Sequence, residues 1–154
     1  MRSKVSTCLW CDGTAEQAAE FYVSLIPDSK VLNVFRPAPG GPALIVEFTL
    51  AGTPYQCLNG GPQFKHSEAA SISVMTKDQE ETDRLWTALT ADGGADGRCG
   101  WVKDRFGLSW QIVPEAITRL LSDKDREAAG RAMQAMMGMR KIDIAKLEAA
   151  FRGT

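Results

Sequence analysis

The order of secondary-structure elements is decided by residues 5–28, which have the sequence VSTCLWCDGTAEQAAEFYVSLIPD. Residues 5–11 are typical of a short strand, which Asp12-Gly13 ends in a turn. The segment Thr14-Ala-Glu-Gln17 has the form of a capping box and predicts the start of a helix. Pro27-Asp28 should end this helix, whose apolar stripe consists of Ala15, Ala18, Ala19, Tyr22 and Leu25 or Ile26.

The same succession of elements occurs twice along the chain. After the first helix, the turn-forming residues 37–42 and Gly52 separate three strand-like runs, at about 30–36, 43–51 and 54–59. A second round follows Gly60-Gly-Pro62, with a strand at 69–76, a helix at about 78–91 and short strands near 95–98, 100–104 and 108–113. The sequence therefore predicts strand–helix–three strands, repeated once.

The two rounds can be aligned on their helices, by placing Glu20-Phe-Tyr22 on Arg84-Leu-Trp86. The same offset places Thr7 on Ser71. Alternation along the strands predicts that the helices cover Cys8, Trp10, Ile72, Val74, Trp110 and Ile112. The other face then carries Thr7, Leu9, Ser71, Ser73, Ser109 and Gln111. We interpret this mixed face as the lining of a ligand cavity rather than as a plain solvated surface.

The remainder of the chain after Pro114 predicts helices, because this proline breaks the final strand. Glu115–Leu121 should form a short helix. Ser122 is expected to cap a longer one that runs to about Met139, and Asp143 a third that carries Ile144, Leu147 and Phe151 at helical spacing. Met133, Met136 and Met137 are more typical of packing or an interface than of a cofactor surface.

Composition excludes several classes of partner. The 154 residues carry 18 basic and 19 acidic side chains, so no field of one sign is available to attract nucleic acid or an anionic membrane. No apolar run approaches the length of a membrane span, and residues 1–11 do not form a signal peptide. We therefore expect a cytoplasmic protein. Its four cysteines, at positions 8, 11, 57 and 99, should be buried, inert thiols, since Cys8 and Cys11 fall on opposite faces of a strand.

The sequence offers few catalytic groups. His66 is the single histidine, and no G-x-S-x-G nucleophile elbow is present. Glu47 in the strand Ile45-Val-Glu-Phe48 is a candidate buried base, although pairing with a cation or contact with solvent is the favoured interpretation. The charged run Lys103-Asp-Arg105 is a candidate contact for an anionic ligand, but such runs are more often solvated.

Several stretches resemble one protein family. They are Leu9-Trp-Cys-Asp-Gly13, Ala19-Glu-Phe-Tyr22, Asn59-Gly-Gly-Pro-Gln-Phe64, Cys99-Gly-Trp101, Asp104-Arg-Phe-Gly-Leu-Ser-Trp-Gln-Ile-Val-Pro114, Met133-Gln-Ala-Met136 and Lys141-Ile-Asp-Ile144. They are similar to the PhnB-like, demethylubiquinone-methyltransferase-like branch of the glyoxalase/bleomycin-resistance, or vicinal-oxygen-chelate, superfamily, over about residues 3–151. The resemblance implies an α+β fold in which two βαβββ modules form a cup-shaped mixed sheet, commonly in a homodimer. It predicts a single domain with module one at about 3–62, module two at about 67–114 and a helical extension at about 115–154.

The resemblance also indicates where the superfamily's metal enzymes place their ligands, on the first and last strand of each module. Carried over to this chain, those positions are Thr7, Gln56, Ser71 and Gln111. Neutral hydroxyls and amides cannot offset the dehydration of a divalent ion, so no metal is expected. No Gly-rich loop follows a first strand, so a dinucleotide or S-adenosylmethionine site is not expected either, and no cofactor is predicted.

The hypothesis for function is therefore a metal-free cup that binds a small organic molecule, in a homodimer. The residues expected to line it are Thr7, Gln56, Ser71, Ser73, Ser109, Gln111, Trp101 and Phe64, and one or two of Trp10, Trp101, Phe64, Phe106 and Trp110 should offer stacking surface. Two alternatives stay open: an enzyme with lyase, transferase or dioxygenase chemistry, or an assembly protein without a ligand.

Overall fold

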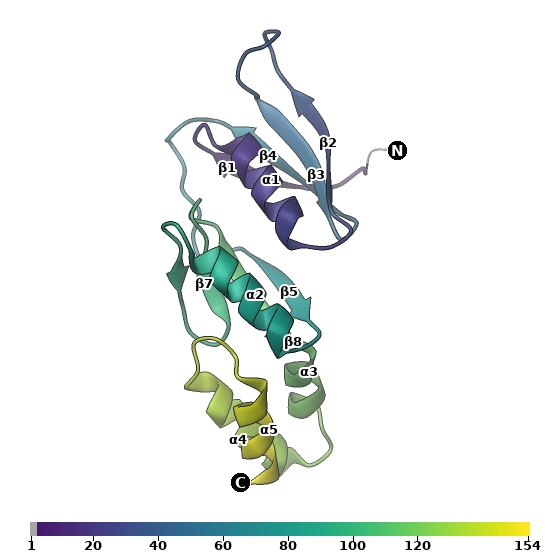
Figure 1. The fold of residues 1–154 in the computed structure, drawn as a ribbon, viewed down its shortest axis with the longest axis vertical. Helices are drawn as coiled ribbons and strands as arrows, with labels where there is room; N and C mark the ends of the chain where they lie inside the picture. Colours follow the sequence, from purple (N-terminus) through teal and green to yellow (C-terminus); the bar gives the residue numbers. More distant parts are fainter. Residues whose placement is uncertain (1–2) are drawn as a thin grey trace. The chain divides into compact units, whose positions relative to one another are not determined.

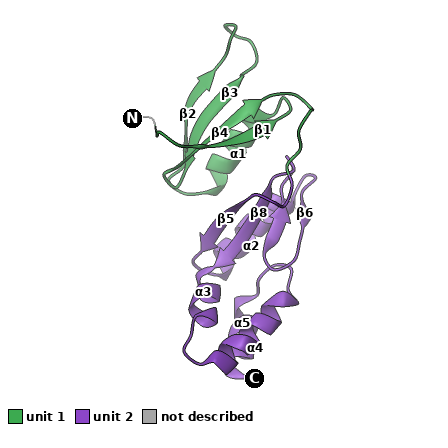
Figure 2. Cartoon of the chain, turned by 180° about the vertical axis from the view of Figure 1, so that it is seen from behind, with its two compact units in different colours: residues 1–66 green, residues 67–154 purple. Residues whose placement is uncertain are grey.

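The computed structural model describes residues 3–154, and the chain divides into two compact units, one ending at His66 and the other beginning at Ser67 (Figures 1 and 2). Each unit has the element order strand–helix–three strands, and three further helices follow in the second unit. The predicted α+β fold with two βαβββ modules and a helical extension is therefore confirmed. The assignment of the whole chain to one domain stays a prediction.

Unit 1 consists of one helix on a four-stranded mixed sheet. Its elements are β1 (Thr7–Cys11), α1 (Ala15–Leu25), β2 (Lys30–Phe35), β3 (Ile45–Leu50) and β4 (Thr53–Asn59). The strand order is β1-β4-β3-β2, with β1 parallel to β4 and the other pairs antiparallel. The predicted stripe of α1 is buried, and Tyr22 from this stripe packs with its ring 6.2 Å from that of Phe48 on β3.

The start of α1 differs from the predicted capping box. Thr14 occupies the N-cap position, but its side chain makes no capping hydrogen bond. Instead, the backbone N–H of Ala15 donates to Asn59 Oδ1 at 3.0 Å, and Asn59 Nδ2 donates to the carbonyl of Ala43. The side chain of a residue at the end of β4 therefore accepts the hydrogen bond of an N–H group at the start of the helix. The local sequence gives no sign of this contact, because the two residues are far apart in the chain.

The predicted face of β1 was wrong by one residue. Leu9 and Cys11 are buried beneath α1, whereas Cys8 is exposed. The cause is a difference in loop length, since the connection from β1 to α1 is one residue longer than that from β5 (Ser71–Thr76) to α2 (Gln79–Thr90). An alignment on the helices therefore shifts the strands by one position and exchanges their faces.

Unit 2 repeats the arrangement with β5, α2, β6 (Ala95–Asp96), β7 (Trp101–Lys103) and β8 (Ser109–Pro114). The strand order is β5-β8-β7-β6, with β5 parallel to β8. Here the predicted faces are confirmed for Ile72, Trp110 and Ile112, which are buried together with Leu85 and Leu89 from α2.

Asp104 organises the turn between β7 and β8. Its Oδ1 accepts hydrogen bonds from the backbone N–H groups of Phe106 and Leu108, and its Oδ2 accepts from Trp110 Nε1 at 2.9 Å. The side chain is only 1% exposed. Asp104 therefore has a structural role in this motif, and the fully buried Trp110 is not one of the one or two aromatic residues expected to offer a stacking surface.

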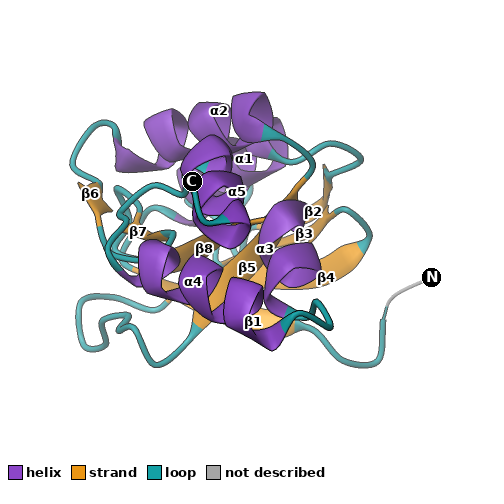
Figure 3. Cartoon of the chain, turned by 90° about the horizontal axis from the view of Figure 1, so that it is seen from below, coloured by secondary structure: helices purple, strands orange, loops and turns teal. Residues whose placement is uncertain are grey.

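The helices of the extension are α3 (Glu115–Leu121), α4 (Arg126–Met137) and α5 (Ile144–Arg152), which pack around Leu120, Ala132, Ile142 and Leu147 (Figure 3). Asp143 caps α5 as predicted, by accepting from Lys146 N. The predicted cap of α4 was wrong, because Asp125 caps it and Ser122 instead donates to the carbonyl of Thr118 at the end of α3.

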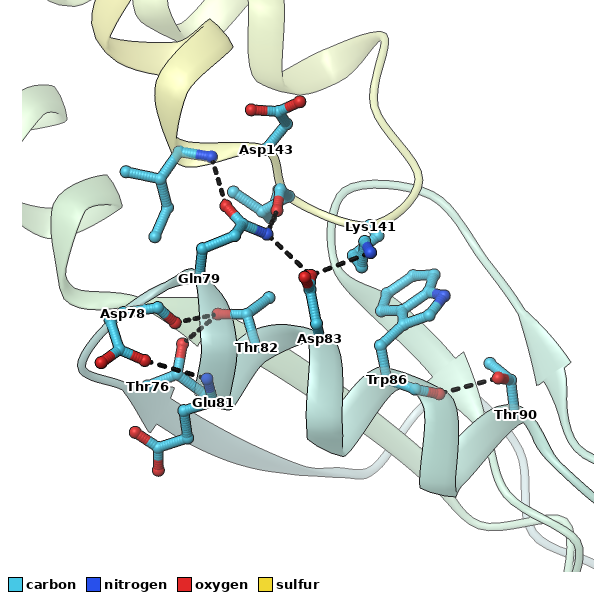
Figure 4. A network of polar contacts seen from close by, with 12 residues as sticks. Thr76, Asp78, Gln79, Glu81, Thr82, Asp83, Trp86, Thr90, Lys141 and Asp143 are labelled. Atoms are coloured by element: carbon cyan, nitrogen blue, oxygen red, sulfur yellow. Dashed lines mark hydrogen bonds and ion pairs between the residues drawn. The ribbon is translucent and has the colours of Figure 1, made fainter.

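Figure 4 shows how the extension is fastened to α2. Gln79 Nε2 donates to the carbonyl of Ile142 and to Asp83, while Gln79 Oε1 accepts from the N–H of Ile144. Lys141 pairs with Asp83 at 2.8 Å. Beside this network, Cys99 N and Gly100 N donate to the carbonyls of Met139 and Arg140. The loop between α4 and α5 is therefore bonded to the rest of unit 2 through both side chains and backbone.

Replacing Asp104 should reveal how strongly the turn depends on it. We expect Asp104→Ala to lower the free energy of unfolding by about 3 kcal/mol or more, because three donors, two of them in buried hydrogen bonds, would lose their acceptor. Urea unfolding followed by tryptophan fluorescence measures this change. Asp96→Ala is the control, since Asp96 is half exposed in its pair with Arg140 and should have a much smaller effect. Equal losses in the two variants would contradict the assignment.

Candidate functional site

The sheet face of unit 2 opposite α2 carries two largely polar rows. Paired residues of neighbouring strands point to the same side, so the register places two rows of three side chains on this face, next to the apolar pair Met75 and Val113. The first row is Ser71, Ser109 and Lys103, and the second is Ser73, Gln111 and Trp101. These six residues are called the unit 2 front face. It brings together five of the residues predicted to line a cup, and their role in binding stays a prediction.

Hydrogen bonding on the unit 2 front face is incomplete. Gln111 Nε2 donates to Ser71 Oγ at 2.9 Å. Ser109 is 1% exposed, and its hydroxyl oxygen is buried without any hydrogen-bond partner. Buried hydroxyls are rarely left unpaired, because the unmade hydrogen bond is costly. The unpartnered Ser109 hydroxyl therefore distinguishes this face from an ordinary sheet surface.

An ion pair adds charge to the unit 2 front face. Lys103 Nζ lies 3.0 Å from Glu68 Oε1, in the loop before β5. The hydrogen bond from Lys103 lowers the pKa of the Glu68 carboxyl. In the sequence Lys103 stands out only as part of a charged run, although its spacing from Trp101 in a strand places the two side chains on one face.

The corresponding face of unit 1 has a different composition. Cys8 is paired with Gln56 and Trp10 with Leu58, and these two β4 residues are paired in turn with Glu47 and Ile45 of β3. These six residues form the unit 1 front face. Thr7 is paired with Tyr55, whose ring stacks on that of the buried Phe48 at 5.5 Å. The structure therefore separates Thr7 from Gln56 and places Cys8 beside Gln56 instead.

An aromatic pair, Trp10 and Phe64, lies at one end of the unit 1 front face. Phe64 packs edge-on against Trp10 at 4.8 Å and stays 65% exposed, and Trp10 Nε1 donates to the carbonyl of Gly61. A Cβ atom at Gly60 would overlap the Trp10 indole, which explains the glycine. His66 Nε2 donates to the carbonyl of Trp10 at 2.7 Å. The histidine therefore has a structural contact, and it anchors the loop that carries Phe64.

The cysteines are free thiols, but the expectation that all are buried was wrong. Cys11 and Cys57 are buried and Cys99 is half-buried, whereas Cys8 is exposed on the unit 1 front face. Partial burial raises the pKa of the Cys8 thiol, and Cys11 raises it further. A protonated thiol is a poor nucleophile. Cys8 is therefore suited to polar contact rather than to redox chemistry.

Two cavities lie within unit 1. One, of about 330 Å³, is lined by residues that include Ser6, Lys30, Glu47 and Tyr55. Burial raises the pKa of Tyr55. The other, of about 380 Å³, lies beside α1 and is lined by residues that include Glu16, Glu20 and Asn59. Neither Thr7 nor Gln56 lines either cavity. The carboxylate of Glu16 forms an ion pair with Arg36. Glu47 thus borders the first of these cavities and is also paired with Gln56 across the sheet.

The donor groups do not suit a divalent metal. On the front faces the first and last strands present Cys8, Gln56, Ser71, Ser73 and Gln111, of which only a thiol with a raised pKa can become anionic. Throughout residues 3–154, no group of three or more His, Cys, Asp or Glu side chains is placed to hold a metal ion. A metal site of the superfamily's kind therefore lacks its ligands here.

None of the helices in the described part of the chain is long and apolar enough to cross a membrane.

Comparison with solved structures supports the fold. A putative 3-demethylubiquinone-9 3-methyltransferase, PhnB protein, from Bacillus cereus is 29% identical, with a TM-score of 0.66 over 73% of this chain and 99% of that one. A protein from Pseudomonas aeruginosa is 19% identical, with a TM-score of 0.59 over 74% and 98%. A fosfomycin resistance protein from Listeria monocytogenes, solved with Mn(II) and dihydroxypropylphosphonic acid, is 15% identical, with a TM-score of 0.52 over 73% and 93%.

Sequence comparison assigns the family. No curated protein matches the sequence. The family model described as 3-demethylubiquinone-9 3-methyltransferase matches residues 3–113, which end just before α3, so the match excludes the helical extension that we expected the resemblance to include. The match covers both βαβββ units, and the chain therefore belongs to the 3-demethylubiquinone-9 3-methyltransferase-like family.

Proposed function

We propose that the protein binds a small, partly polar organic molecule at its unit 2 front face without the help of a metal ion. The observation that carries this proposal is the buried, unpartnered hydroxyl of Ser109 among the neutral polar groups of that face. A ligand that hydrogen-bonds to this hydroxyl would remove the cost of leaving it unpaired. The half-buried Trp101 indole in the adjacent row offers apolar surface to the rest of the ligand.

The helix N-termini do not offer a binding site for the nucleotide-type cofactor that a methyl transfer would use. Such cofactors bind where a Gly-rich loop exposes the N–H groups at the start of a helix. In this chain Asn59 accepts the N–H of Ala15 at the start of α1, and Asp78 accepts that of Glu81 in α2. Protein side chains already occupy both positions, and the carboxylate of Asp78 would repel a phosphate or carboxylate group.

We also propose a homodimer. In unit 1 the strand β1 pairs along one edge only, and in unit 2 the same holds for β5. An unpaired strand edge presents N–H and C=O groups that can pair with another chain. The family resemblance implies a homodimer, and in our proposal the second copy completes the walls of the binding site. The cytoplasmic location stays a prediction.

Metal analysis tests the first part of the proposal. Protein purified without chelators or an affinity tag should contain only trace metal by elemental analysis, because no three His, Cys, Asp or Glu side chains of residues 3–154 come together to hold a metal ion. Addition of zinc or manganese should leave the melting temperature unchanged. Near-stoichiometric zinc, manganese, nickel or iron would contradict the proposal and favour a metal-dependent enzyme.

Ligand screening with a blocked variant tests the site. We expect ligand-observed NMR to find binders among small aromatic amides and acids, and Ser73→Trp to abolish their binding, because the indole would cover the second row of the unit 2 front face. Thr87→Trp, at an exposed position of α2, is the matched control and should retain binding. Binding that survives Ser73→Trp would place the site elsewhere, and the absence of any binder would contradict the proposed function.

Light scattering coupled to size-exclusion chromatography tests the assembly. We expect a mass about twice the 16.8 kDa of the chain. The double variant Met133→Glu with Met137→Glu should stay dimeric, because the proposed interface uses strand edges rather than the exposed methionines of α4. A monomer would refute the dimer, and a dimer lost in the methionine variant would move the interface to the extension.

A further inference from the structure

We propose that the unit 2 front face recognises its ligand through an oxyanion, a carboxylate or phosphonate group, which displaces Glu68 from Lys103 and accepts a hydrogen bond from Ser109. This inference rests on the proposed function and narrows it to a class of ligand. Without a ligand, the Glu68 carboxylate occupies the place of this oxyanion beside Lys103. We call the Lys103–Glu68 ion pair the cover.

The position of the ion pair follows from the strand order. Ser71, Ser109 and Lys103 are in register across the adjacent strands β5, β8 and β7. Glu68 shortly precedes Ser71, on the β5 side of this row, and its carboxylate reaches Lys103 on the β7 side. The ion pair therefore joins segments on either side of β8 at the level of Ser109. In our proposal this ion pair covers Ser109, which is buried although it lies on the face opposite α2.

The hydrogen-bonding groups of the row favour an anion. Lys103 supplies an ammonium group with three donor hydrogens. Ser109 has a hydroxyl hydrogen without an acceptor, and Ser71 Oγ already accepts from Gln111, which leaves its own hydrogen for donation. The row thus presents one positive charge and two hydroxyl donors. An oxyanion can accept from all three, whereas a neutral amide or alcohol would leave the charge of Lys103 uncompensated.

The cover is easily opened. The Lys103 and Glu68 side chains are 44% and 67% exposed, and ion pairs of this kind shift an equilibrium by no more than about fivefold. While the pair is closed, the Ser109 hydroxyl stays buried and unsatisfied, which disfavours the closed state. A ligand oxyanion that replaces Glu68 keeps the charge interaction of Lys103 and gives Ser109 its missing acceptor. The Trp101 indole in the neighbouring row favours an aromatic or planar group next to the oxyanion.

Calorimetric titration with phenylphosphonate at low ionic strength tests the inference. We expect binding to the wild-type protein, and binding up to about fivefold tighter in Glu68→Gln, because the competing carboxylate is removed. Lys103→Met and Ser109→Ala should each weaken binding about tenfold or more. Lys141→Met and Asp83→Asn, which break a similarly exposed ion pair of the same unit, should leave binding unchanged.

Benzamide serves as the neutral probe that separates this inference from the proposed function. The proposed function stands if benzamide binds to the wild-type protein and Ser73→Trp abolishes that binding. The oxyanion inference is overturned if phenylphosphonate does not bind, or if Lys103→Met leaves its affinity unchanged. If neither probe nor any other screened molecule binds, both are overturned. Unchanged or weaker phenylphosphonate binding in Glu68→Gln would overturn the displacement of Glu68. Ser109→Ala should melt no lower than the wild type, since the hydroxyl makes no hydrogen bond to lose.

Discussion

The Asp104 carboxylate is the constraint on which the arrangement of the unit 2 front face depends. It binds the two backbone N–H groups of the β7–β8 turn and the indole of Trp110, all within a buried environment. These bonds hold Trp110 on the α2 side of β8, and strand alternation then sends Ser109 and Gln111 to the opposite side. The same turn fixes the pairing of Lys103 with Ser109. A shift of one residue at this turn would replace the polar row by apolar side chains.

The sequence predicted unit 2 better than unit 1, for a physical reason. Periodicity identifies which residues share a face of a strand, but only the connection to the helix decides which face the helix covers. The loop between β5 and α2 is one residue shorter than that between β1 and α1, so a correct assignment in one unit gave the wrong face in the other. Contacts between distant residues were equally inaccessible: the capping of α1 by Asn59 and the ion pair of Lys103 with Glu68 leave no periodic signal.

The helical extension lies beyond the part of the chain that the family model matches, yet it is firmly attached. Gln79 satisfies a carbonyl and an N–H group of the extension with one amide, and these backbone groups would otherwise lack a partner at the start of α5 (Figure 4). The sequence predicted the three helices from their spacing, but not this attachment. The extension is bonded to α2, the helix that covers the other side of the sheet, and to the backbone of Cys99 and Gly100 just before β7.

The two front faces, each taken by itself, differ in a way that bears on recognition. Unit 1 offers a thiol, an amide and the exposed Trp10–Phe64 pair, whereas unit 2 offers hydroxyls, an amide, an indole and a lysine. Apolar and aromatic surface provides most of the affinity for a small molecule, while a few directed polar groups set its orientation. The unit 2 front face holds both kinds of group in adjacent rows, whereas the charged group beside Gln56 in unit 1 is the carboxylate of Glu47. A molecule with an aromatic body and one anionic end therefore matches unit 2. A hydrated divalent ion matches neither face, because within residues 3–154 no three acidic, histidine or cysteine side chains gather to replace its water.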